Sequence, residues 1–211
     1  MPRVCRAETE KNRTAIRRAS SRLFREQGLR ASVSDVMKAA GLTHGGFYGH
    51  FGCKDDLAAD ACAMAFAESA TRWRKRAEGA ADRPSAHAAL IEGYLTARNR
   101  AAIGSGCPIA ALAIDVARES LDKPVRQAFH AGLERLIALL ARLESRPGAG
   151  AARAQALAEL ATMLGALVLA RATDGSALSD EFMDAARNSL LGPGKVSSRA
   201  RRPSPRRRRA R

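Results

Sequence analysis

The sequence is poor in aromatic residues, cysteine and acidic residues. Aromatic side chains make up 4% of the 211 residues, and the four cysteines, at positions 5, 53, 62 and 107, form no C-x-x-C pair. This spacing argues against a disulfide framework and favours a reducing compartment. Because 36 Lys and Arg stand against 21 Asp and Glu, the net charge of +15 indicates a polyanionic partner, nucleic acid first.

Long apolar runs are also missing. The most apolar stretch, Leu160 to Ala170, is about half of the roughly 20 residues that a membrane-spanning helix needs. The N-terminal segment MPRVCRAETEKNR is polar and lacks the apolar centre of a signal peptide. We therefore expect a cytoplasmic protein that has no membrane partner.

Sequence patterns for catalysis and metal binding are absent as well. The chain has no H-E-x-x-H, G-x-S-x-G, P-loop or dinucleotide fingerprint. Its four histidines (His44, His50, His87 and His130) are scattered, and its acidic residues and cysteines form no cluster with ligand spacing. The sequence thus predicts no catalytic residue, no metal ligand and no cofactor, and therefore no enzyme.

The residues that are present indicate an all-α protein. Apolar residues make up 46% of the chain, Ala and Leu are frequent, and no segment shows the alternation of a strand. Helical periodicity and the positions of Gly and Pro predict nine helices. Their approximate ranges are 8–27, 33–40, 44–50, 54–78, 85–103, 108–119, 124–145, 151–172 and 179–190.

The stretch from Ala31 to Leu57 predicts two short helices that are joined by a tight turn. Ser32 and Asp35 have the spacing of a capping box at the start of the first helix. Gly41 ends that helix, since a left-handed C-cap costs glycine no Cβ strain. The apolar face of this helix is formed by Val33, Val36, Met37 and Ala40. Such a pair of helices is a helix-turn-helix, whose second helix lies in the major groove of DNA.

The pattern AGLTHGGFYGHFGCKDDL within this stretch resembles the DNA-binding domain of TetR-type repressors. Ten residues match that family's pattern, namely Gly41, Leu42, Thr43, Gly45, Phe47, Tyr48, His50, Phe51, Lys54 and Leu57. Cys53 departs from it, because the family usually has Ser or Asn there to cap the next helix. The motif covers about residues 9–60, and a GCPIAAL segment at Gly106 to Leu112 also looks like one in some family members.

The resemblance implies a domain organisation. A three-helix DNA-binding domain is expected at residues 9–60, and a six-helix ligand-binding and dimerisation domain at residues 61–191. An Arg-rich tail that we expect to be disordered follows at residues 192–211. Residues 195–211 hold one Lys, eight Arg and no acid, and so carry nine of the fifteen net positive charges. This tail is a solvated extension, a non-specific DNA arm or, in a eukaryote, a nuclear import signal.

The resemblance also implies which residues contact DNA. Positions that usually contact phosphates are occupied here by Thr43, Tyr48, His50 and Lys54. Positions that face base edges are occupied by Ser34, His44, Gly45 and Gly46. Two adjacent glycines cost a helix about 1 kcal/mol each relative to Ala. Either they let the backbone approach DNA closely, or the first turn of this helix merely frays.

The family resemblance implies a transcriptional repressor that binds a palindromic operator in double-stranded DNA as a homodimer. An unknown small-molecule effector would release it. The candidate effector-binding residues are Phe66, Trp73, Tyr94, Cys107 and Phe129, although core packing explains each of them equally well. Two other functions remain open, a DNA packer that acts through the tail and an enzyme with an apolar pocket.

Two features of the second domain carry further expectations. Cys107 precedes Pro108 at a helix start, where it is either a reactive sensor thiol or a buried N-cap. The last two helices carry a broad apolar surface, formed by Leu157, Leu160, Ala161, Leu164 and Val168. We expect them to pair with their copies as a four-helix bundle.

Overall fold

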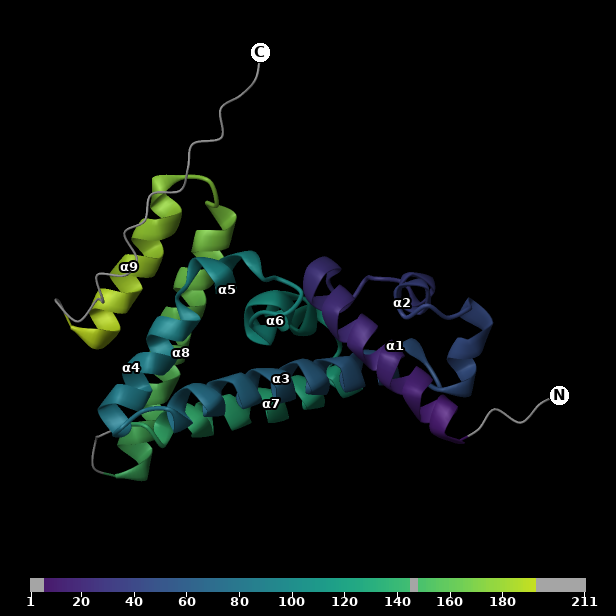
Figure 1. Cartoon of the computed structure of the whole chain (residues 1–211), viewed down its shortest axis with the longest axis horizontal. Coiled ribbons are helices and arrows are strands. Elements are labelled where there is room, and N and C mark those ends of the chain that lie inside the picture. Colours follow the sequence, from purple (N-terminus) through teal and green to yellow (C-terminus); the bar gives the residue numbers. More distant parts are fainter. Residues whose placement is uncertain (1–5, 145–147, 193–211) are drawn as a thin grey trace, which may run out of the picture.

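The computed structural model describes residues 6–144 and 148–192 (Figure 1). This part of the chain is all-α, as the sequence predicts, and contains no strand. The elements are α1 (Arg6–Gln27), α2 (Val33–Ala39), the 3-10 helix η1 (His44–Gly49), α3 (Lys54–Glu78), α4 (Arg83–Tyr94), α5 (Ala97–Ala101), α6 (Pro108–Arg118), α7 (Pro124–Ala141), α8 (Ala149–Ala172) and α9 (Ala177–Leu191). Cys5 and the Arg-rich tail from residue 193 onward lie outside the described residues.

The expected helix at residues 85–103 is divided into α4 and α5. Leu95 leaves the helical region with ψ at 66°, and Thr96 begins a new helix by accepting a hydrogen bond of 3.1 Å from the Asn99 backbone N–H. The Asn99 side chain in turn donates to the Tyr94 carbonyl at 2.8 Å. These side-chain hydrogen bonds satisfy backbone groups at the break, so the interrupted conformation competes with a continuous helix.

The expected α-helix at residues 44–50 is a 3-10 helix. Gly46 donates to the Thr43 carbonyl at 3.1 Å, and His50 donates to the Phe47 carbonyl at 2.9 Å, which are both three-residue spacings. Gly45, Gly46 and Gly49 make up half of this six-residue element. Because glycine disfavours the α-helix and the element is short, the tighter 3-10 winding is adopted instead.

The helices α1, α2 and η1 form one end of the molecule, and α8 and α9 form the opposite end (Figure 1). The long helix α3 runs between them and packs along α7. Gly132 on α7 makes this close approach possible, because a Cβ atom there would collide with the ring of Phe66 on α3. Leu136 and Leu57 are fully buried in the core that results.

Helix α8 is both long and apolar. By length and composition alone it could cross a membrane, and 39% of its most apolar window is buried inside the molecule. Leu160, Met163 and Leu167 face the core, whereas Leu157, Val168 and Leu169 are exposed. The helix is therefore a core helix with a second apolar face that the described residues leave uncovered.

Candidate nucleic-acid interface

The capping box that the sequence predicts sets the start of α2. The Asp35 backbone N–H donates to Ser32 Oγ at 3.0 Å, and the Ser32 N–H donates to Asp35 Oδ2 at 3.4 Å. Hydrogen bonds from Ser32 lower the pKa of Asp35 below its ordinary value. At the other end of the helix, Gly41 has φ of +74°, which is the left-handed conformation that glycine adopts without strain.

Two aromatic rings fix η1 against the rest of the module. Phe47 and Phe51 are buried, and their rings stack with centroids 5.9 Å apart. The guanidinium of Arg13 on α1 lies 5.2 Å from the centre of the Phe51 ring, a cation–π distance. Both rings point inward, as the sequence predicts, and of the residues between them Tyr48 and Gly49 are exposed whereas His50 is half-buried.

The outward surface contains the residues that we expected to contact DNA. Six of them are exposed, namely Ser34, Thr43, His44, Gly45, Gly46 and Tyr48. Tyr48 is 72% exposed. His50 and Lys54 are half-buried at the end of this surface, where α3 begins. The eight residues thus follow one another from α2 through η1 to the first residue of α3.

The exposed glycines of η1 are not required by contacts within the chain. A Cβ atom on Gly45 would meet no atom within 4 Å, and one on Gly46 would be in ordinary contact with Met37 at 3.7 Å. Neither residue has a positive φ angle. The packing and backbone of the described chain would therefore accept alanine at both positions.

The start of α3 is held by a contact from α7 rather than by its own cap. Cys53 is the N-cap residue and makes no capping hydrogen bond, in agreement with the weak cap expected from a thiol. The ammonium of Lys123, at the N-cap of α7, lies 2.6 Å from Asp55 Oδ2 in the first turn of α3. This ion pair raises the pKa of Lys123 above its ordinary value.

The C-terminal end of α1 is fastened to α6, a contact that the sequence did not reveal. The Leu29 backbone N–H donates to Asp115 Oδ2 at 2.9 Å. Gly28 allows this approach, because any Cβ at that position would collide with the same carboxylate oxygen. The buried Arg25 adds an ion pair to Glu68 at 2.9 Å and a hydrogen bond to the Gly106 carbonyl at 3.3 Å.

Four of the five candidate effector-binding residues form two aromatic pairs. Phe66 and Phe129 pack edge to face with ring centroids 5.2 Å apart, and Trp73 and Tyr94 do the same at 6.1 Å. Of the five, only Trp73 lines the apolar cavity of about 130 Å³ between α3, α4 and α7. Its other lining residues include Leu90, Leu139 and Leu143.

The two described cysteines of the helical domain are both buried. Cys107 is 3% exposed and is the N-cap residue of α6, although its thiol makes no capping hydrogen bond. The Gly104–Gly106 loop therefore does not expose this thiol in the structure. Burial raises the pKa of Cys62 to about 12, and burial together with the neighbouring Cys107 raises the pKa of Tyr94.

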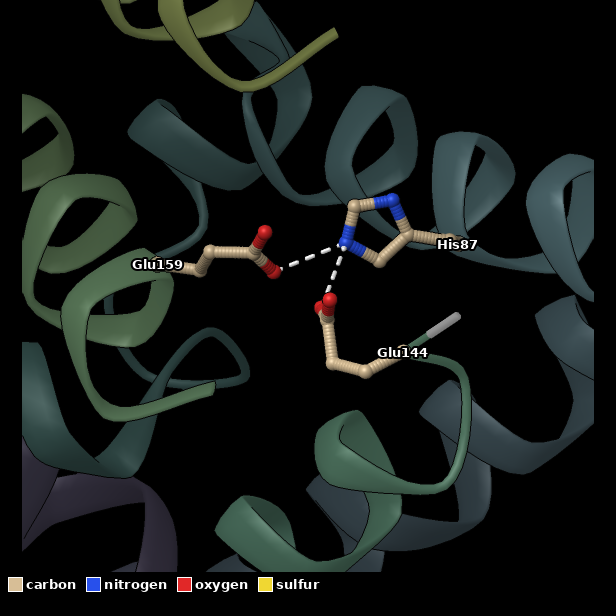
Figure 2. A group of neighbouring side chains, drawn as sticks. All are labelled: His87, Glu144 and Glu159. Atoms are coloured by element: carbon tan, nitrogen blue, oxygen red, sulfur yellow. Dashed lines mark hydrogen bonds and ion pairs between the residues drawn. The ribbon is translucent and has the colours of Figure 1, made fainter. Parts of the chain in front are cut away.

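The structure also contains a group of donor atoms that could hold a metal ion, which the sequence does not indicate. His87 lies on α4, Glu159 lies on α8 and Glu144 follows the end of α7, and their donor atoms are within 4.8 Å of one another (Figure 2). Because these residues are far apart along the chain, no ligand spacing marks them. They lie in the helical domain, away from the surface formed by α2 and η1.

Comparison with known proteins places this geometry in context. Residues 16–61 match the family model described as "Bacterial regulatory proteins, tetR family". A search of curated protein sequences finds no match to the chain.

Several solved structures share the fold. A TetR-family transcriptional regulator from Cytophaga hutchinsonii has a TM-score of 0.74 at 20% identity, over 88% of this chain and 96% of that one. A TetR transcriptional regulator from Chloroflexus aurantiacus J-10-FL has a TM-score of 0.72 at 22% identity, over 88% and 94%. The reduced form of E. coli NemR has a TM-score of 0.71 at 20% identity, over 85% and 95%. The predicted family resemblance is confirmed, and the chain has the fold of TetR-family transcriptional regulators.

Proposed function

We propose that this chain is a DNA-binding repressor of the bacterial cytoplasm. Its residues 16–61 match the tetR-family model, and it has the fold of TetR-family transcriptional regulators. It would bind a palindromic operator as a homodimer and leave it when an effector binds. The observation that supports this most directly is the run of exposed and half-buried residues from α2 through η1 to the start of α3. That surface carries an exposed ring, Tyr48, and two glycines that the described fold does not require.

On this surface, we assign two kinds of contact with double-stranded DNA. Thr43, Tyr48, His50 and Lys54 would contact phosphates and set the position of the protein on the duplex. Ser34 and His44 would face base edges in the major groove, and the glycines would let the backbone come close. Because few long side chains are available, methyl contacts and bridging waters would contribute to sequence reading.

Dimerisation is supported by the uncovered face of α8. Leu157 and Val168 are exposed on this helix, and Ala161 and Leu164 lie between them in the sequence, exposed and half-buried respectively. Leu160, which we expected on the same surface, is instead buried in the core of the chain itself. A two-fold axis that pairs α8 and α9 with their copies would cover this face and present two DNA-binding modules to successive major grooves.

Release by a small-molecule effector is supported by the contacts between the N-terminal module and the helical domain. The cavity is lined by Trp73 and Ala77 of α3, the helix whose first residue is Lys54. An effector that binds better when this cavity is enlarged would displace α3 and favour the conformation that does not bind DNA. The Leu29–Asp115 and Arg25–Gly106 hydrogen bonds join α1 to α6 and its preceding loop, and so provide a second connection.

A redox or electrophile signal at Cys107 is a second route of release. The carbonyl of the preceding residue, Gly106, accepts hydrogen bonds from Arg25 at 3.3 Å and from Arg72 at 3.1 Å. Modification of the buried Cys107 thiol would require space and would disturb these contacts to α1 and α3. If this route operates, an oxidant or alkylating agent releases the protein from DNA, and Cys107→Ser binds DNA but ignores the agent. Equal release of both proteins would leave Cys107 as a structural cap.

The proposed function is tested by substitutions on the outward surface, measured against an operator and against random DNA. Tyr48→Phe, His50→Ala and Lys54→Ala should weaken binding to all sequences alike, because they remove phosphate contacts. Changes at His44 or Ser34 should instead alter which base is preferred. If Lys54→Ala shifts the sequence preference and leaves the overall affinity unchanged, the placement of this surface on DNA is wrong.

A further inference from the structure

Three side chains from separate parts of the helical domain converge on one point. His87 lies on α4, Glu159 lies on α8, and Glu144 follows the end of α7. His87 Nε2 is 2.7 Å from Glu159 Oε2 and 3.2 Å from Glu144 Oε1. Figure 2 shows both carboxylates directed at this nitrogen, while the other ring nitrogen points away from them.

The cluster is largely withdrawn from water. The side chains of His87, Glu144 and Glu159 are 17%, 9% and 4% exposed. A buried carboxylate is costly unless it is paired or bound to a metal ion. Although burial raises the pKa of Glu159, hydrogen bonds with His87, Gln155 and Glu144 lower it below its ordinary value. The hydrogen bond to Glu159 is the main cause that raises the pKa of His87.

A proton on His87 serves this arrangement less well than a metal ion. The Nε2 atom carries at most one hydrogen, which can point directly at only one acceptor. Two carboxylate oxygens from different elements nevertheless face this same atom (Figure 2). A cation placed between the three donor atoms would attract both carboxylates and displace the proton from His87, whose neutral imidazole would then offer its Nε2 lone pair as a ligand.

We propose that His87 Nε2 and one carboxylate oxygen from each of Glu144 and Glu159 bind a divalent transition-metal ion of the zinc class. Imidazole suits such ions, whereas Mg²⁺ and Ca²⁺ prefer sites made of oxygen ligands. In a tetrahedral zinc site with bonds of about 2.0–2.2 Å, neighbouring ligand atoms lie about 3.3–3.6 Å apart. The observed separations of 2.7 and 3.2 Å would have to open by less than about 1 Å. Water would complete the coordination.

Gln155 supports the site from one turn earlier on α8. Its side-chain N–H donates to Glu159 Oε1 at 3.0 Å, which leaves Oε2 of the same carboxylate directed at His87. Such a hydrogen bond to a ligating carboxylate fixes its orientation. The bound ion would join α4, the end of α7 and α8 by direct bonds, so metal binding should also raise the thermal stability of the chain.

The test uses the full-length, tag-free chain after treatment with a chelator. Equilibrium dialysis against Zn²⁺ should give one ion per chain, and Co²⁺ should give the intense visible absorption of a low-symmetry site. Glu159→Gln and His87→Gln should lose both signals and the rise of the melting temperature with Zn²⁺. The matched controls are His130→Gln and Glu181→Gln, which change exposed residues elsewhere and should bind as the unmodified chain does.

The variants remain informative if one of them folds poorly. Circular dichroism in the presence of chelator checks folding. Glu144→Gln provides a second carboxylate variant, at the one of the three positions that lies outside a helix. Absence of stoichiometric binding to the unmodified chain would overturn the proposal and leave a hydrogen-bonded ion pair. Undiminished binding in the folded variants, or loss of binding in Cys53→Ser instead, would also overturn it. None of these measurements involves DNA, so the result is independent of the proposed repressor function.

Discussion

The backbone N–H of Leu29, just beyond α1, donates a hydrogen bond of 2.9 Å to Asp115 Oδ2 on α6. This contact joins the module that carries the proposed DNA-binding surface to the helical domain. Because Gly28 has no Cβ atom, the carboxylate of Asp115 has room beside it, and Leu29 itself is buried. The pair is therefore a point at which a change in the helical domain can reach α1.

Removal of this carboxylate should destabilise the chain. Asp115→Ala leaves the Leu29 N–H without its acceptor, which costs about 1–3 kcal/mol of unfolding free energy for a buried donor. Chemical denaturation would measure this loss. Ile114→Ala, at the neighbouring and largely exposed position, is the control and should change stability by less than about 0.5 kcal/mol. Equal stability of Asp115→Ala and the parent chain would show that the contact contributes nothing.

Substitution of Gly45 tests the contact with DNA without affecting folding. Because a Cβ atom at this residue would have no neighbour within 4 Å and φ is not positive, Gly45→Ala should melt at least as high as the parent chain. If the backbone comes close to DNA here, the added methyl group should lower operator affinity about tenfold or more, or about 1.4 kcal/mol. Gel-shift or anisotropy titration measures this.

Gly79→Ala is the matched control, since its Cβ would also meet no atom and it lies at the far end of α3. It should bind the operator like the parent chain. Full affinity in Gly45→Ala would mean that the backbone at this residue does not approach the duplex.

The uncovered face of α8 predicts the oligomeric state. Leu157→Glu and Val168→Glu place charges in the expected interface and should convert a dimer into monomers. Leu121→Glu changes a residue that is 82% exposed before α7 and should leave the dimer intact. Light scattering at micromolar concentration distinguishes these outcomes, and a monomeric parent chain would refute the four-helix interface.

The Arg-rich tail makes a prediction from charge alone. Each phosphate that is neutralised contributes about −0.9 to the slope of log affinity against log salt concentration. If half of the nine cations at residues 195–211 contact DNA, their deletion should flatten the slope by about 4 per subunit. Preference for the operator over random DNA should survive, because cations at phosphates read no base. An unchanged slope would leave the tail in solvent.

Local signals made part of the fold predictable from the sequence. The range of α3, Lys54–Glu78, is as expected, because its periodic apolar residues end at Gly79. The capping box of Ser32 and Asp35 and the left-handed Gly41 also follow from residue type and spacing. By contrast, the break at Thr96 depends on hydrogen bonds from Asn99, for which the periodic pattern of the segment gave no sign.

The candidate sites were predictable to different degrees. The outward surface follows from the inward pair Phe47 and Phe51, so exposure of Tyr48 could be inferred from the sequence. The DNA contacts and the domain boundary near residue 60 stay predictions. The Leu29–Asp115 contact and the convergence of His87 with two glutamates result from tertiary packing, which no spacing in the sequence marks.

The measurement that tests the central claim most directly is selection of bound DNA from a random-sequence pool, with the full chain and with a chain that lacks residues 195–211. The account predicts that both proteins enrich the same inverted repeat, with half-sites about one helical turn apart, roughly 34 Å. Binding without any enriched sequence, or enrichment that disappears with the tail, would contradict it, because the surface of α2 and η1 would then not be reading the DNA.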